Sequence, residues 1–166
     1  LWNRYKQEYL PRLKEAALIA KNSSCYRDHM HVVMIAGNLR NDLLDREIDI
    51  FIEIAKQISP IVNDKATEGI VLVSAPPLSD NRFCEMKKAG ISKVVFNLEA
   101  LCLENFKKFC PGKNDLGYDF WLNQLKKAVE VFGVGNVWSN LVLGLESNSE
   151  CLEKCNEISQ LGIVLS

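Results

Sequence analysis

The sequence lacks a strong charge of either sign, a long apolar run and a recognisable leader. Its 20 basic and 21 acidic residues leave a net charge of −1, so no charged surface is expected to attract nucleic acid or an anionic membrane. No apolar run approaches the roughly 20 residues that span a bilayer, and the first residues do not form a signal peptide. The chain also begins without methionine. We expect a cytoplasmic protein with neither nucleic acid nor membrane as partner, whose chain starts within a longer protein.

Metal-binding patterns are also scarce. Six cysteines are scattered through helix-like and strand-like segments, which favours reduced thiols over a disulfide framework. Cys151 and Cys155 have a motif-like spacing, but they lie on an amphipathic helix, where cysteine behaves as a small hydrophobic residue. His29 and His31 share one face of a strand without a third ligand nearby. We therefore predict no metal-ligating and no catalytic residue in this chain.

Short apolar runs do alternate with longer segments of helical period, which is typical of parallel strands joined by helices. We expect strands at residues 31–36, 70–74, 93–97, 136–143 and 163–166. Between them, apolar residues recur on one helical face. These faces are formed by Ile48, Phe51, Ile52, Ala55 and Ile58, and by Trp121, Leu125, Ala128, Val129 and Phe132.

The remaining helices are predicted from their ends. Pro11 suits the first turn of a helix that runs to about residue 21. Gly90 provides a stop for a helix that follows Ser79. Residues 147–150 form a capping box, and the helix behind it is expected to turn Leu152, Cys155 and Ile158 inward.

Two folds use this alternation: an open doubly wound sheet and a (β/α)₈ barrel. The chain stops in its last strand, residues 163–166, with no helix after it to cover a strand of the buried type. This favours an α/β fold that is a partial parallel (β/α) barrel of about five strands. We expect residues 1–30 to form an N-terminal helix and linker, and residues 31–166 to form the central part of a barrel truncated at both ends.

Both folds bind ligands at the carboxyl ends of their strands. The residues that follow the predicted strands are therefore the candidates for a binding site. They are Gly37, Asn38, Ser74, Asn97, Glu99, Asn140, Gly144 and Glu146. Alternatively, Gly37 and Gly144 simply make tight turns, and Glu99 and Glu146 cap the helices that follow.

Four segments of the second half carry a resemblance to a known family. They are KVVFNLE at 93–99, FCPGK at 109–113, YDFWLNQLKKAVEVFG at 118–133 and NVWSNLVLGLE at 136–146. Together they resemble the middle of a radical S-adenosylmethionine barrel, in the branch related to biotin synthase. The resemblance covers residues 31–166 and implies a role for most of the candidates.

The turn at Gly37 and Asn38 takes the place that meets the amino group of the methionine moiety, although only the glycine keeps the family pattern. Asn97 and Glu99 take the place near the ribose or the methionine carboxylate. The strand that packs against adenine is matched loosely, by Asn140, Gly144 and Glu146, with asparagine in place of the first family glycine and the acid one position early.

The resemblance also implies a [4Fe–4S] cluster held by three thiolates in Cys-x₃-Cys-x₂-Cys. This chain has no such motif, so we expect it before the first residue, in a parent enzyme that cleaves S-adenosylmethionine reductively. Such an enzyme needs a reducing electron donor and a small-molecule substrate, and this chain alone would be inactive.

Two alternatives stay open. One is a non-catalytic α/β module that binds a nucleotide or a partner without a cluster. The other is an aldolase-like barrel, which Lys93 fits poorly because it begins its strand. Lys113 is expected in a solvated turn, Cys110 in a plain turn, and Trp121 and Trp138 in apolar packing.

Overall fold

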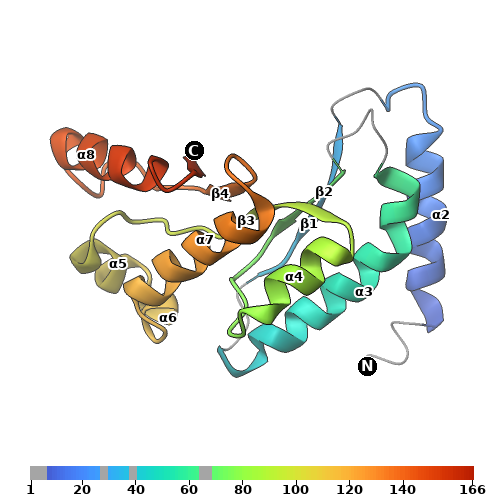
Figure 1. Cartoon of the computed structure of the whole chain (residues 1–166), viewed down its shortest axis with the longest axis horizontal. Helices are drawn as coiled ribbons and strands as arrows, with labels where there is room; N and C mark the ends of the chain where they lie inside the picture. The colour runs from blue at the N-terminus through green and yellow to red at the C-terminus, as the bar shows by residue number, and fades with distance from the viewer. Residues whose placement is uncertain (1–6, 27–29, 38–40, 64–68) are drawn as a thin grey trace.

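The chain folds into one parallel sheet with its helices in sequence between the strands (Figure 1). The computed structural model describes residues 7–26, 30–37, 41–63 and 69–166. The strands are β1 (His31–Ile35), β2 (Gly69–Val73), β3 (Ile91–Val95), β4 (Val137–Ser139) and β5 (Ile163–Leu165). The helices are α2 (Leu10–Lys21), α3 (Leu44–Val62) after the 3₁₀ turn η1 (Asn41–Leu43), α4 (Asn81–Lys88), α5 (Leu103–Phe109), α6 (Pro111–Asn114), α7 (Tyr118–Phe132) and α8 (Asn148–Ser159). No helix among these residues is long and apolar enough to cross a membrane.

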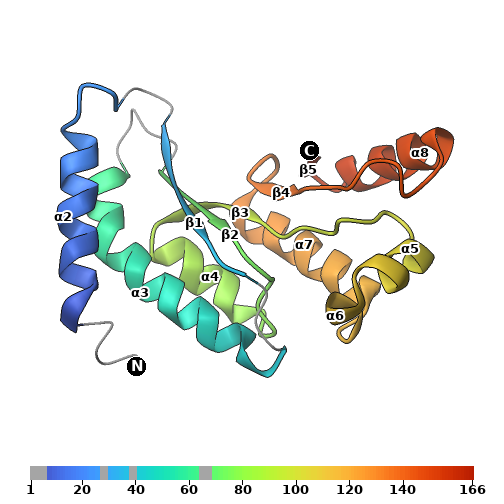
Figure 2. The same cartoon turned by 180° about the vertical axis from the view of Figure 1, so that it is seen from behind.

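The order of the strands distinguishes a barrel from a doubly wound sheet. All five strands are parallel, and their order in the sheet is their order in the chain. A doubly wound sheet would reverse its order around an inner strand, whereas successive right-handed crossovers in one direction place all helices on one face. In Figures 1 and 2, α3, α4 and α7 do lie on one face. The prediction of a parallel (β/α) barrel-like fold is confirmed.

One row of paired residues crosses the sheet and forms its contact with the helices. Met34 pairs with Leu72, Leu72 with Val94, Val94 with Val137, and Val137 with Ile163. All five side chains are buried. Because side chains alternate along a strand, their neighbours point to the other face, and on β1 Val33 and Ile35 are 43% and 70% exposed. The core therefore lies on the helical side of the sheet.

Each predicted strand is present, but the fourth is much shorter than expected. The apolar pattern predicted residues 136–143, and the ladder ends at Ser139. Beyond Ser139 the chain leaves the regular ladder. Leu141 forms an isolated bridge with Glu99, whose backbone hydrogen-bonds to Asn140 O and Val142 N. This departure places residues 140–145 at the rim instead of in the sheet.

The predicted helix ends are present too. Pro11 stands in the first turn of α2, Gly90 follows α4 with φ +99°, and Ser147 and Glu150 form the capping box of α8. The prediction that Leu152 points inward is wrong. Its side chain is 65% exposed, since α8 turns Cys151, Cys155 and Ile158 toward the core instead.

The N-terminal helix α2 lies along α3, on the side of α3 away from the sheet in Figure 1. Lys21 Nζ donates to Ile61 O at 2.6 Å and ties the end of α2 to the last turn of α3. The separation of residues 1–30 from a barrel at 31–166 stays a prediction.

Two neighbouring residues of β1 test the one-sided core. Met34→Ala should lower the free energy of unfolding by about 2–5 kcal/mol, because it leaves a cavity against the helices. Ile35→Ala, on the open face, should change it by no more than about 0.5 kcal/mol. Urea unfolding of both variants measures this. Equal losses would contradict a sheet covered on one face.

Candidate functional site

Two adjoining cavities open at the carboxyl ends of the strands. The smaller, of about 230 Å³, is bordered by four of the predicted residues: Gly37 after β1, Ser74 after β2, and Asn97 and Glu99 after β3. The structure therefore brings together candidates that are up to 62 positions apart in the sequence (37 to 99). Parallel strands explain this, because their carboxyl ends meet along one rim.

The larger cavity is a cleft of about 1080 Å³ on the other side of Glu99. Its walls come from the start of α3, from Ala75, from the segment 109–115, and from Val142 and Leu145 beyond β4. Glu99, Lys113 and Trp121 border both cavities. These three residues thus form the wall that separates them.

An ion pair organises that wall. Lys113 Nζ lies 2.9 Å from Glu99 Oε1, and it also donates to Asn97 O at 2.7 Å. The ammonium sits 4.8 Å from the centre of the Trp121 ring, and Trp121 Nε1 in turn donates to Lys113 O at 3.2 Å. The side chain of Lys113 is only 11% exposed.

Lys113 corrects one expectation. It does not lie in a solvated turn, because α6 carries it over the end of β3 to Glu99. The Pro-Gly pair before it begins this short helix. Trp121 is buried as predicted, and it also borders both cavities. No local pattern predicts this contact, since neither α5 nor α6 was expected.

Glu99 is held in an unusual backbone conformation. It has φ +68°, and among the described residues other than glycine it alone has a positive φ. Such a conformation costs on the order of 1–3 kcal/mol and persists where the surroundings hold it. Here Glu99 N donates to Asn140 O at 3.1 Å, and Glu99 O accepts from Val142 N at 2.8 Å. Asn97 adds a further tie, since its Oδ1 accepts from Asn140 N at 3.2 Å.

Three of the other predicted residues lie outside both cavities: Glu146, Gly144 and Asn140. Glu146 Oε1 accepts from the backbone amides of Leu101 (2.9 Å) and Cys102 (3.2 Å), at the start of α5. Gly144 is exposed with φ +91°. Asn140 Oδ1 accepts from Ser166 Oγ at 2.6 Å. Asn38 lies outside the described residues. The binding roles of these four residues stay predictions.

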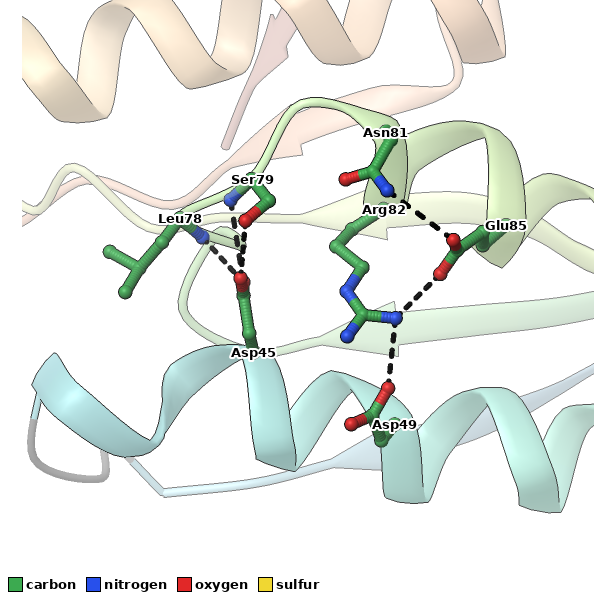
Figure 3. Close-up of polar contacts among 7 residues, drawn as sticks. All are labelled: Asp45, Asp49, Leu78, Ser79, Asn81, Arg82 and Glu85. Atoms are coloured by element: carbon green, nitrogen blue, oxygen red, sulfur yellow. Dashed lines mark hydrogen bonds and ion pairs between the residues drawn. The ribbon is translucent and has the colours of Figure 1, made fainter.

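Asp45 fixes the loop that carries Ser74 and Ala75 (Figure 3). Its Oδ1 accepts from Leu78 N at 2.7 Å, and its Oδ2 accepts from Ser79 Oγ at 2.6 Å. One turn further along α3, Asp49 pairs with Arg82 of α4 at 2.9 Å. These contacts join α3 to the β2–α4 connection, so the rim beside the cavities is braced from outside.

The cysteines do not form a cluster site. Among the described residues, no group of three histidines, cysteines or acids could hold a metal ion. Cys151 and Cys155 lie on α8, and burial raises the pKa of Cys155. Cys110 is buried and borders the cleft, rather than lying in a plain turn, and burial raises its pKa too. His31 is exposed on β1, and His29 lies outside the described residues.

Comparison with solved structures finds proteins of similar fold. The fold is similar to the crystal structure of HydG, a maturase of the [FeFe]-hydrogenase, with a TM-score of 0.65 and 17% sequence identity. The match covers 91% of this chain and 32% of that one, so the chain spans about a third of the length of HydG. No family model and no curated protein matches the sequence.

At this identity the likeness shows the fold alone. This chain shares with the matched part of HydG an arrangement of parallel strands and helices that is barrel-like. The resemblance to the radical S-adenosylmethionine family, and to its branch related to biotin synthase, rests on the sequence.

The ion pair predicts an energetic coupling between two elements. In a double-mutant cycle of Glu99→Gln and Lys113→Met, the coupling should exceed about 1 kcal/mol of unfolding free energy, because the pair is largely shielded from water. The exposed pair Lys154–Glu157, at 2.7 Å, is the control and should couple by less than about 0.5 kcal/mol. Similar values for both cycles would show that the contact between Lys113 and Glu99 is not formed in solution.

Tyr118 predicts a loss of stability at high pH. Its hydroxyl donates to Leu101 O at 2.9 Å, and burial raises its pKa from 10.0 to about 12. The unfolded chain therefore loses this proton first. Stability should fall as the pH rises from about 10 to about 12, and Tyr118→Phe should fall less steeply. Urea midpoints across this range measure it, and equal slopes would refute the assignment.

Proposed function

We propose that this chain is part of the barrel of a radical S-adenosylmethionine enzyme and binds S-adenosylmethionine at the carboxyl ends of its strands. One observation carries the proposal: Gly37, Ser74, Asn97 and Glu99, chosen by position and by family resemblance, border a single cavity. The fold shared with HydG supports it. Kinship with biotin synthase rests on the sequence resemblance alone.

The groups at this cavity suit one end of the cofactor. Its volume of about 230 Å³ is below the roughly 300–1,000 Å³ of sites that enclose a whole organic ligand. Glu99 uses Oε1 for Lys113, which leaves Oε2 to accept from the ribose hydroxyls or the α-ammonium group. Asn97 uses Oδ1 for Asn140 N, which leaves its amide nitrogen as a donor to the methionine carboxylate. Gly37 lets the ligand approach the backbone, since no side chain stands there.

The cluster does not fit the residues of this chain. A [4Fe–4S] cluster in such an enzyme supplies the electron that cleaves S-adenosylmethionine, and it needs three thiolates at Cys-x₃-Cys-x₂-Cys spacing. The sequence contains no such set. We assign the cluster, the electron donor and the small-molecule substrate to the activity of the whole enzyme. What this chain's residues do is bind and orient the cofactor.

The setting we propose is the reducing cytoplasm. All six cysteines are free thiols, and disulfides are rare where glutathione keeps thiols reduced. The alternative function is a nucleotide- or partner-binding module without a cluster. The observation that favours it is that this sequence contains no Cys-x₃-Cys-x₂-Cys motif. Such a module would use the same cavity without reductive chemistry.

Equilibrium dialysis with S-adenosylmethionine tests the site. Glu99→Gln keeps the shape of the side chain and removes its charge, so it should weaken binding by about 10- to 150-fold, the equivalent of about 1.5–3 kcal/mol for a charged hydrogen bond. The control is Glu104→Gln on α5, an exposed acid that borders neither cavity. It should bind like the wild type. Equal affinity for all three proteins would refute the assignment of Glu99.

A further inference from the structure

The large cleft has walls of its own. It is bordered by Leu44, Cys110, Val142 and Leu145, which do not border the small cavity. Among the described residues, the two cavities share the wall of Glu99, Lys113 and Trp121. At about 1080 Å³, it reaches the upper end of the size range of organic ligand sites, roughly 300–1,000 Å³. A second molecule can therefore occupy it beside a ligand in the small cavity.

Most of the cleft is lined by apolar groups. Trp121, Leu44 and Ala75 are buried beneath it. Phe109 and Val142 are 49% and 48% exposed, and both border the opening. Apolar side chains left half exposed around a concave site gain free energy when a ligand covers them. The body of the expected ligand is thus apolar.

The charge of the cleft determines which polar group the ligand carries. Among the described residues that border it, Lys113 alone is basic. Its ammonium is already directed to Asn97 O, to Glu99 Oε1 and to the face of Trp121. An ammonium has three donors, so none is left for an anionic ligand. Lys108 lies over the Phe109 ring at 4.9 Å but does not border the cleft.

Acceptors, in contrast, are available. Glu99 borders the cleft and gives Oε1 to Lys113, which leaves Oε2 as an acceptor. Asp115, at the end of α6, is exposed, and it borders the cleft but not the small cavity. These oxygens would bind a donor group, and a carboxylate or phosphate placed there would meet like charge without a partner.

We propose that the cleft between η1, α6 and the segment after β4 binds a second small molecule, an apolar compound that carries a primary amine. The amine pairs with Asp115 and with the second lone pair of Glu99 Oε2, whose first accepts from the ligand of the small cavity. The apolar body lies against Phe109 and Val142. Identification of this molecule as the substrate rests on the proposed function. Its binding to the cleft does not.

Two probes of matched size and opposite charge test the ligand class: 2-phenylethylamine and 3-phenylpropionate, titrated into the protein by calorimetry. The amine should bind at least tenfold more tightly than the carboxylate. Two blocking variants separate the sites. Val142→Trp fills only the large cleft, and Gly37→Trp fills only the small cavity. Both positions are exposed, so the fold should tolerate them.

Val142→Trp should weaken binding of the amine at least tenfold and leave S-adenosylmethionine affinity within twofold. Gly37→Trp should weaken S-adenosylmethionine binding at least tenfold and leave the affinity for the amine within twofold. Asp115→Lys, a surface charge reversal that needs no repacking, should lower the preference for the amine at least fivefold. Absence of amine binding, equal affinity for both probes, or amine binding unaffected by Val142→Trp and Asp115→Lys would overturn the inference. If the wild-type protein binds the amine but not S-adenosylmethionine, the result would count against the proposed function and leave the cleft assignment standing.

Discussion

The site depends on the ion pair between Lys113 and Glu99. Lys113 comes from a short helix after α5, and Glu99 follows β3, so the pair ties the long β3–α7 connection back to the sheet. A shielded ammonium is costly unless its donors are satisfied, and here the carboxylate, the Asn97 carbonyl and the Trp121 ring satisfy them. Glu99 itself is held at φ +68° by its backbone hydrogen bonds with Asn140 and Val142. The ion pair thereby sets the wall between two cavities and the direction of Glu99, which alone among the described acids borders both.

The parallel topology makes this interaction possible. Because every strand runs the same way and follows its neighbour in the chain, all the strand-to-helix connections leave the sheet at one rim. Acids near this rim brace the connections: Asp45, in the first turn of α3, holds the loop after β2, and Glu146 holds the start of α5. The rim is thus fixed by local hydrogen bonds, while the core lies below it between sheet and helices.

The sequence could predict the periodic part of this structure. The strand positions, the helix ends and the capping box of α8 follow from local patterns, and the carboxyl ends of the strands follow from topology. Contacts between residues far apart in the chain could not be predicted from the sequence. Nothing near Lys113 indicates a partner 14 positions earlier, because short α5 and α6 carry no clear apolar period. Glu146 shows the opposite difficulty, since an acid after a strand suits both a ligand and the amides of a nearby helix. Its structure-supporting contacts are with Leu101 and Cys102.

The most direct test of this account is chemical-shift mapping of the backbone amides during titration with S-adenosylmethionine. The account predicts that the largest changes occur at Gly37, Ser74, Asn97 and Glu99, on three different connections, and that Lys113 changes with them. The amides of α8 and of the opposite strand ends should stay unchanged. Changes concentrated at the amino ends of the strands, or no change at saturating cofactor, would contradict a cofactor site at this rim.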